Sequence, residues 1–536
     1  DRSNTIIEPL LTEQWFVDAK SLAKKPINIV KENKTSFFPK NWTKTFFQWM
    51  DQIEPWCISR QIWWGHRIPA WYGEDNQIFV AENYKEAKIL AKKKYKNNNF
   101  KLRQETDVLD TWFSSALWPF ATLGWPKKTK ELKKFYPTSV LVTGFDIIFF
   151  WVARMMMMGN YVQKLTPFKK VYVHALVRDE KGQKMSKSKG NVIDPLELIN
   201  DYGADSLRFT LISMASPGRD VKLSKDRVVG NRNFITKIWS ANNFLNLNKC
   251  KLTKKINLKN IKLPANQWIF NEFLETKNKT TKHIEDFRFD EASRVIYKFV
   301  WHSYCDWYLE FLKPIFNSKN KSKIEEARNF SSFMMSNILK ILHPFIPFFT
   351  ETVWGNNKYN KFYKSPLIQA EWAEIKKQSN FNKNHKDISN IIEIISNIRS
   401  TKAELNIAPK LYCDIIFSDK SKLTKKLINQ NLEIIQQVGR INEVLDEQVN
   451  NTIEILVLKE RLALKFNEDI DMFLQKNNIL EKINILVKKI ANLHNKLKNK
   501  AYLKNAPKKI VQNDKALLSD LTIEENKLRS IVSSIN

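Results

Sequence analysis

Cysteine and glycine are scarce in this chain of 536 residues, and each scarcity excludes a type of structure. The four cysteines stand singly, at Cys57, Cys250, Cys305 and Cys413, and no Cys-x-x-Cys pair occurs. A disulfide framework and a cysteine-ligated zinc site are therefore excluded, and we expect no bound metal and a reducing, cytoplasmic compartment. The 12 glycines include no Gly-x-x-x-x-Gly-Lys-Ser/Thr sequence, which excludes a Walker A phosphate loop.

Long apolar runs are also missing. The most apolar stretch, residues 140–161, is interrupted by Asp146 and Arg154, and Gly144 divides it into a short strand and a helix. We therefore expect no membrane-spanning helix and no membrane partner. The polar segment that begins at Asp1 is unlike a signal peptide.

Acidic residues are in the minority, with 56 Asp and Glu against 88 Lys and Arg, and the formal net charge is +32. A surplus of that size favours a polyanionic partner, and nucleic acid is the leading candidate. The Lys- and Asn-rich run at residues 92–99 indicates a competing explanation, a general compositional bias. A chain of this length should divide into several domains.

The most informative segment is the pentapeptide Lys-Met-Ser-Lys-Ser at residues 184–188, in a polar loop bracketed by Gly182 and Gly190. A loop that carries lysines on a movable backbone can bring ammonium groups to a polyphosphate and stabilise charge on its oxygens. The alternative is an ordinary solvated loop, since Lys-Ser runs are common in so lysine-rich a chain.

The flanks of this loop favour a functional role. Apolar residues from Val171 to Val177 predict a buried strand before it. After it, Asp194, Pro195 and Glu197 stand in the order typical of a helix start, with Asp194 as the N-cap. A loop between such a strand and helix is suited to meet a polyphosphate.

The remaining segments differ in pattern. Residues 107–213 predict an α/β region, with strands at 135–143 and 171–177 that are each followed by a helix. Residues 225–371 contain only two glycines and predict a helix bundle, interrupted near residues 342–348. Within it, one helical face is expected to hold Ala292, Ile296, Phe299, Ser303 and Trp307.

Residues 376–457 return to a mixed pattern, with predicted strands at 412–417 and 452–458. Heptad spacing then predicts two helices that fold back on each other, with a break at Ala506-Pro507. The first apolar seam comprises Ile479, Ile483, Leu486, Ile490, Leu493 and Leu497, and the second Leu517, Leu521, Leu528, Ile531 and Ile535. The lysine-rich faces of this hairpin could rest on a phosphate backbone or simply keep it soluble.

Several long blocks resemble the valyl-tRNA synthetase family of class I aminoacyl-tRNA synthetases. Residues 51–72 carry Trp-Cys-Ile-Ser-Arg-Gln-x-Trp-Trp-Gly-His-Arg-Ile-Pro-Ala-Trp-Tyr, and residues 107–118, 143–155 and 501–511 are similar to further blocks of that family. Residues 184–188 are similar to its second active-site motif. The resemblance runs essentially end to end.

The resemblance implies a multidomain α/β plus α protein with five regions. The expected regions are the end of an editing insertion and its return to the core (1–40), the second half of a Rossmann-like catalytic domain (41–224), a helical-bundle anticodon-binding domain (225–372), a small α/β junction (373–465) and an antiparallel coiled-coil hairpin that binds tRNA (466–536).

The resemblance also implies a reaction: ATP and Mg²⁺ activate valine, and the valyl group passes to tRNA(Val). It assigns catalysis to Lys184 and Lys187. ATP binding falls to Gly144, Asp146, His174, Met185, Ser186 and Lys187, and the valine pocket to Trp112, Ile147 and Trp151. For Trp112 and Trp151 the alternative is plain core packing. Arg60, His66 and Arg67 are either polar supports under the site or structural residues.

Two departures from the family pattern stand out. Ala175 follows His174 where the family commonly has glycine, and the His-x-Gly-His motif of class I enzymes is absent among the seven histidines. We therefore expect a C-terminal portion of a monomeric enzyme, with the first catalytic half and most of the editing domain upstream, which binds tRNA but is inactive alone. The alternatives are an isoleucine–tRNA ligase and a non-catalytic tRNA-binding protein.

Overall fold

The computed structural model describes most of the chain, in two compact units. The described residues are 5–6, 8, 11–97, 99–186, 190–218, 220–373, 378, 381–417, 422–446, 452–458, 460–466, 472–499, 502 and 508–534. The first unit comprises residues 1–193, 213–224 and 285–290, and the second 194–212, 225–284 and 291–536. No described helix has the length and apolar character needed to cross a membrane.

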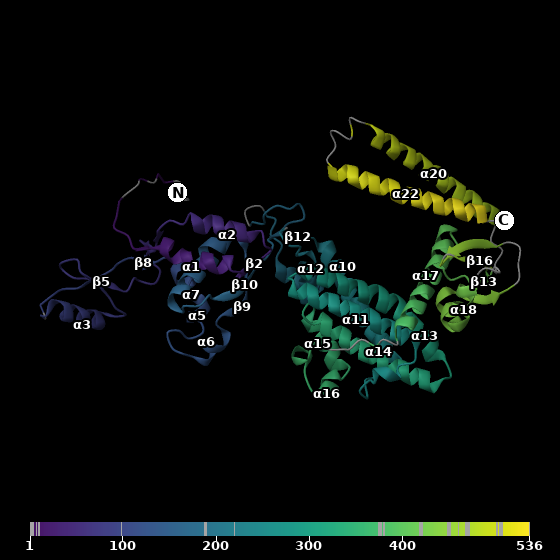
Figure 1. Ribbon diagram of the computed structural model, residues 1–536, viewed down its shortest axis with the longest axis horizontal. Helices are drawn as coiled ribbons and strands as arrows, with labels where there is room; N and C mark the ends of the chain where they lie inside the picture. Colours follow the sequence, from purple (N-terminus) through teal and green to yellow (C-terminus); the bar gives the residue numbers. More distant parts are fainter. Residues whose placement is uncertain are drawn as a thin grey trace. The chain divides into compact units, whose positions relative to one another are not determined.

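A parallel three-stranded sheet lies at the centre of the first unit, in the order β2 (Ser36–Phe38), β10 (Phe168–Val173), β9 (Thr138–Thr143). The helices α1 (Ala19–Lys31), α2 (Trp42–Asp51) and α7 (Arg154–Val162) pack around it (Figure 1). Parallel strands covered in this way carry apolar side chains that are fully buried, as Phe37, Leu141 and Val171 are here.

The strand predicted at 171–177 is wrong at its end, because β10 stops at Val173. Its partner β9 ends at Thr143, and after one more backbone bond, from His174 N to Thr143 O at 2.9 Å, no neighbour remains to pair with. Val177 instead pairs with Val221 in a separate two-stranded parallel sheet. That sheet consists of β11 (Val177–Arg178) and β12 (Val221–Lys222).

The predicted strand 135–143 is confirmed only from Thr138 onward, since helix α6 (Lys130–Phe135) occupies its first position. Gly144 then separates strand from helix as expected. The helix begins as a 3-10 turn, η1 (Phe145–Ile147), continues as a π-helix, η2 (Ile148–Ala153), and only then becomes the α-helix α7. Wide π turns are rare and occur frequently at functional sites.

Short elements complete the first unit. They are β1 (Phe16–Val17), β3 (Trp56–Cys57), β4 (Ser59–Arg60), β5 (Ala70–Tyr72), β6 (Ile78–Val80), α3 (Tyr84–Tyr95), β7 (Arg103–Gln104), β8 (Val108–Leu109), α4 (Thr111–Ser115) and α5 (Trp118–Ala121). β1 pairs with β3, β4 pairs with β8, and β5 pairs with both β6 and β7.

The second unit is mainly helical. Its helices before residue 380 are α8 (Pro195–Tyr202), α9 (Ala204–Met214), α10 (Lys225–Leu247), η4 (Leu258–Asn260), α11 (Pro264–Glu285), α12 (Phe289–Lys298), η5 (Phe299–Tyr308), α13 (Leu309–Asn317), α14 (Lys321–Leu342), α15 (Pro347–Asn356), α16 (Tyr359–Tyr363) and η6 (Leu367–Gln369). The predicted N-cap is confirmed, because the Asp194 side chain accepts a hydrogen bond from Leu196 N at 2.8 Å. The predicted break after residue 342 is confirmed as well.

The helical face predicted at 292–307 is correct in its first half and wrong in its second. Ala292, Ile296 and Phe299 are buried, but Ser303 and Trp307 are partly exposed. From Phe299 to Tyr308 the chain is a π-helix, whose wider turn moves the buried face on by one residue. Tyr304 and Tyr308 therefore take the buried positions.

A four-stranded sheet follows, in the order β14 (Ile441–Leu445), β13 (Cys413–Phe417), β16 (Glu460–Phe466), β15 (Ile453–Val457). β13 and β15 confirm the two predicted strands, and β14 and β16 were not predicted. The helices in this part of the chain are α17 (Asn382–Glu404), α18 (Lys422–Gln430) and α19 (Leu432–Gly439).

Two long helices end the chain, α20 (Met472–Lys498) and α22 (Lys508–Ser534), and they pack along each other (Figure 1). Ile479, Ile483 and Leu486 are buried as predicted. Leu517 is wrong as a seam residue: it is 47% exposed, and its neighbour Leu518 is less exposed. Leu517 lies four residues before Leu521 and Leu518 three residues before it, and both spacings occur in a heptad seam, so spacing alone could not choose between the two leucines.

The other residues of the two predicted seams differ in how far they are buried. Ile490, Leu493, Leu497 and Leu521 are partly buried, and Leu528 is buried. The Ile531 side chain, Ile535 and the predicted break at Ala506-Pro507 lie outside the described residues. The coiled-coil hairpin itself stays a prediction.

Glu105 joins three segments of the first unit and generates a prediction about pH. Its carboxylate accepts hydrogen bonds from Trp15 Nε1 at 2.9 Å, Tyr72 OH at 2.5 Å and the backbone N–H groups of Thr106 and Asp107. Burial alone would raise the pKa of Glu105, but these bonds outweigh it and lower the pKa to about 2.

Because the folded pKa of Glu105 is lowered, its contribution to stability is complete above the unfolded value of 4.5 and is lost as pH falls toward 2. We expect Glu105→Gln to lower the free energy of unfolding at pH 7 by about 2–3 kcal/mol and to flatten its pH dependence below pH 5. Urea unfolding from pH 3 to pH 7 measures both effects. Exposed Glu54→Gln is the matched control, and identical pH profiles for the two variants would contradict the assignment.

Candidate functional site

The candidate site lies where strands β9 and β10 end. Thr143 pairs with Val173, so the next residues, Gly144 and His174, leave the same edge of the sheet side by side. Ligands of parallel α/β sheets bind outside the carboxyl ends of neighbouring strands. The register therefore places two of the predicted ATP residues at an edge suited to a ligand.

The structure brings Gly144, Asp146 and His174 together. A Cβ built on Gly144 would lie 2.5 Å from Asp146 Oδ1 and 3.8 Å from His174 Cε1. The missing side chain at Gly144 thus makes room for the Asp146 carboxylate against the backbone. Asp146 and His174 are both exposed, so a carboxylate acceptor and an imidazole are available to a ligand at this edge.

The His174 ring is oriented by its own neighbour. His174 Nδ1 lies 2.9 Å from Ala175 O, which leaves Nε2 as the ring nitrogen not used in this contact. Ala175, at the position where the family commonly has glycine, is partly buried.

The predicted valine-pocket residues are only partly brought together. Trp112 on α4 stacks on Phe150, with ring centroids 5.8 Å apart, and Trp151 packs against Trp118 at 5.7 Å. Trp151 Nε1 also donates a hydrogen bond to Ser115 O at 3.3 Å. Trp112 lies on α4 and Trp151 on the π-helix, and each packs against a different aromatic partner.

Ile147 ends the 3-10 turn η1 and is partly exposed. Its backbone angles, φ −113° and ψ 13°, are not helical, so no regular α-helical turn joins Ile147 to Trp151. Trp112 and Trp151 are also partly buried against the core of the first unit. Both the pocket and the core-packing interpretations therefore keep support.

Beneath these aromatic side chains lies a buried charge network that sequence analysis missed. Asp110 is 6% exposed, and its carboxylate lies 3.4 Å from Arg154 NH1 and 3.4 Å from Arg60 NH2. Trp56 Nε1 donates to the same carboxylate at 3.0 Å, and the Arg154 guanidinium lies 3.9 Å from the centre of the Trp56 ring. The network joins β4 and α4 to the start of α7.

Burial lowers the pKa of Arg154 to about 10, and the Asp110 carboxylate opposes that shift, so Arg154 is charged at neutral pH. A signal for this pair was present in the sequence, since Asp110 and Arg154 both fall within the family-like blocks. Arg60 belongs to the network, and Arg67 donates through Nε to Glu105 O. The backbone carbonyl of His66 accepts a hydrogen bond from Leu109 N at 2.7 Å.

The lysine loop is described up to Ser186. Lys184 is exposed, and Met185 and Ser186 are partly buried. Lys187, the second predicted catalytic residue, lies outside the described residues. Gly182 at the base of the loop has φ +80°, a backbone conformation that favours glycine. A Cβ there would lie 2.9 Å from Lys222 Cε, the flexible end of a side chain that could move aside.

A side chain that sequence analysis did not single out holds this loop. Asn191 Oδ1 accepts a hydrogen bond from Ser186 N at 3.0 Å, and Asn191 Nδ2 donates to Lys184 O at 3.3 Å and to Asp179 Oδ2 at 2.9 Å. Asparagine after a glycine is common in loops, and no pattern in the sequence marks this one.

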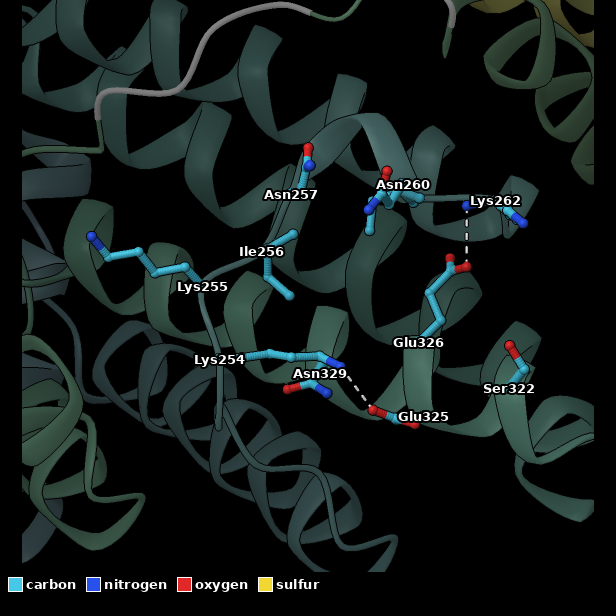
Figure 2. Close-up of a pocket in the computed structure, with 11 residues that line it drawn as sticks. Lys254, Lys255, Ile256, Asn257, Asn260, Lys262, Ser322, Glu325, Glu326 and Asn329 are labelled. Atoms are coloured by element: carbon cyan, nitrogen blue, oxygen red, sulfur yellow. Dashed lines mark hydrogen bonds and ion pairs between the residues drawn. The ribbon is translucent and has the colours of Figure 1, made fainter.

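The helical unit contains a polar cavity of about 690 Å³ that holds none of the predicted residues (Figure 2). Its lining includes Lys254, Lys255 and Lys262. Two glutamates of the lining interact with other lining residues: Glu325 pairs with Lys254 Nζ at 2.9 Å, and Glu326 accepts a hydrogen bond from Lys262 N at 3.1 Å. Across the described part of the chain, no three His, Cys, Asp or Glu side chains form a cluster that could hold a metal ion.

Comparisons with known proteins point in one direction. Residues 4–224 match the model of "tRNA synthetases class I (I, L, M and V)", and residues 266–417 match "Anticodon-binding domain of tRNA ligase". The whole chain is similar to valine–tRNA ligases, with 50% identity to that of Pelagibacter ubique and 44% to that of Rhizobium meliloti.

The chain spans 61% and 59% of the lengths of these two relatives. Among solved structures, a LeuRS–tRNA–LeuAMS complex from Agrobacterium radiobacter is similar over 75% of this chain and 51% of its own, with 15% identity and a TM-score of 0.49.

The substitution Gly144→Ala tests whether ATP binds at the edge of the sheet beside Asp146. The added methyl group would force the Asp146 carboxylate to rotate away, which removes an acceptor from the edge but requires no backbone shift. We expect the Kd for ATP to rise about tenfold, the effect of one lost hydrogen bond to a charged group, while the free energy of unfolding changes by less than about 1 kcal/mol.

Isothermal titration with ATP measures the affinity. The control is Gly230→Ala on α10, where a Cβ meets nothing within 4 Å and alanine should slightly stabilise the helix. Unchanged ATP affinity in Gly144→Ala would show that the Asp146 carboxylate does not contact the nucleotide.

Proposed function

Because residues 4–224 match the class I tRNA synthetase model and the full length of the chain is similar to valine–tRNA ligases, we propose that it serves as part of a valine–tRNA ligase. The observation that carries the proposal within the structure is the placement of Gly144, Asp146 and His174 at the carboxyl ends of β9 and β10. The chain covers about three fifths of its relatives, so the activity of the whole protein is inferred.

In the proposed first step, a carboxylate oxygen of valine attacks the α-phosphorus of ATP, and the bond from that phosphorus to the bridging oxygen of pyrophosphate breaks. Asp146 accepts hydrogen bonds from ribose hydroxyls, and Gly144 lets the nucleotide approach the backbone. Lys184 and Lys187 stabilise negative charge on the phosphates. In the second step a hydroxyl at the tRNA 3′ end takes the valyl group, and AMP leaves.

The residues present fit ATP better than they fit a resident metal. The described residues offer no metal cluster, and Mg²⁺ in such reactions is typically bound through substrate phosphates and water. When bound, Mg²⁺ would supply charge neutralisation on the triphosphate. Trp112, Ile147 and Trp151 would bound the apolar space for the valine side chain.

The second unit is proposed to contact tRNA(Val). The match of residues 266–417 to an anticodon-binding model supports this role for the helices. Bases of a single-stranded loop are commonly recognised by stacking and by polar contacts to their edges. The pair α20 and α22 would brace the tRNA elsewhere. We propose a monomeric, cytoplasmic enzyme.

Lys187→Ala tests the chemistry. Removing an ammonium group that acts on the transferring phosphoryl group should lower valine-dependent ATP–pyrophosphate exchange by about 10²–10³-fold and leave the affinity for tRNA within about twofold. The assay uses the longest natural form of the protein that carries residues 1–536. The control is Lys88→Ala on α3, an exposed lysine outside the loop.

Equal exchange rates for wild type and Lys187→Ala would contradict the assignment of the loop. Strong tRNA binding without any amino-acid-dependent exchange would favour the alternative, a non-catalytic tRNA-binding protein.

Salt dependence tests whether the net charge of +32 serves tRNA binding. If about six phosphates are contacted, affinity for tRNA(Val) should fall about 10³-fold between 50 mM and 200 mM salt. A filter-binding titration measures it, with a tRNA of unrelated identity as the control. If both tRNAs bound equally weakly at every salt concentration, the charge would reflect compositional bias instead.

A further inference from the structure

The carboxamide of Asn191 uses both its donor and its acceptor atoms on the lysine loop. Its oxygen accepts from Ser186 N at 3.0 Å, and its nitrogen donates to Lys184 O at 3.3 Å. These two backbone groups flank Met185 within the family-like motif. One side chain therefore fixes the backbone on both sides of that residue.

The same nitrogen also donates to Asp179 Oδ2 at 2.9 Å. Asp179 in turn organises the base of the loop: its Oδ1 accepts from Gln183 N at 2.7 Å, and its carbonyl accepts from Gly182 N at 2.9 Å. The hydrogen bond from Asn191 is the largest cause that lowers the pKa of Asp179. Asp179 is thus an ionised anchor between the loop base and Asn191.

We propose that Asn191, held by Asp179, is a positioning residue for amino-acid activation: it sets the backbone from which Lys184 reaches the triphosphate. This inference rests on the proposed function, because it assigns a role within that reaction. Asn191 itself touches no reacting atom and acts through the backbone of Lys184 and Ser186.

Asparagine is required by the chemistry of the three bonds. Alanine would lose all of them. Aspartate could still accept from Ser186 N, but it would face the Asp179 carboxylate and the Lys184 carbonyl with no proton to donate. Leucine or another apolar side chain would leave the Ser186 N–H without its partner on Asn191.

The experiment compares Asn191→Ala and Asn191→Asp with wild type in the longest natural form of the protein. Hydrogen–deuterium exchange of a peptide that spans Ser186 reports the loop backbone, and a peptide from β10 reports the fold. Valine-dependent ATP–pyrophosphate exchange gives kcat and KM separately. Asn397→Ala is the control, because Asn397 is a partly exposed asparagine on α17, outside the lysine loop, that donates to Glu393 O at 3.0 Å.

We expect faster deuterium exchange at Ser186 in Asn191→Ala and a smaller increase in Asn191→Asp, whose carboxylate can still accept from Ser186 N. Exchange in β10 should be unchanged, and kcat should fall about 10- to 100-fold in both variants with the KM for valine nearly unchanged. The double variant Asp179→Asn with Asn191→Asp restores the bond between the two side chains with donor and acceptor reversed. It should recover part of the lost kcat.

Two results would overturn the proposal: unchanged exchange at Ser186 in Asn191→Ala, or faster exchange there with kcat unaffected. An equal fall in kcat for Asn397→Ala would overturn it too. Absence of valine-dependent activity in the wild type would instead contradict the proposed function, and the deuterium exchange at Ser186 would still decide whether Asn191 holds the loop.

Discussion

The parallel pairing of β9 with β10 is the constraint on which the candidate site depends. The two strands end at the same level, with Thr143 paired to Val173 as the last pair of the register. That common end brings Gly144, Asp146 and His174 to one edge, although Asp146 and His174 are 28 positions apart in the sequence. A shift of the register by one residue would reverse the faces of one strand and separate these side chains.

The π-helix η2 and the buried network around Asp110 form a second level of organisation. A π turn holds more residues than an α turn, and three successive side chains of this one, Phe149, Phe150 and Trp151, each have an aromatic partner. A buried carboxylate is tolerated only when charged or hydrogen-bonding groups compensate it, as Arg154, Arg60 and Trp56 do for Asp110. The packing of the predicted pocket residues therefore depends on a charge cluster beneath them.

Sequence analysis succeeded where local chemistry decides the structure. The Asp194 cap, the break at Gly144 and the separation of helical from mixed regions all follow from capping, glycine and periodicity. It failed for β10, which stops at Val173 because its partner strand β9 ends at Thr143. It also failed for η5, where the wide π turns shift the buried positions by one residue. The contacts of Asn191 were missed because hydrogen bonds across an irregular loop leave no periodic signal, and those of Asp110 because its partners Arg60 and Arg154 lie far away in the chain, with only the family-like blocks as a sign of them.

The base of the lysine loop shows how far such long-range dependence extends. β11 leads into the loop and pairs with β12, and Arg178 forms an ion pair with Asp220. β12 comes about 40 residues later, after α8 and α9, which belong to the other compact unit. The base of the loop therefore pairs with a strand that the chain reaches only after a segment of the second unit. Closing a loop of that length costs conformational entropy, and the pairing of β11 with β12 and the ion pair between Arg178 and Asp220 offset part of that cost. The segment proposed to act on ATP is thus held by residues on both sides of this excursion.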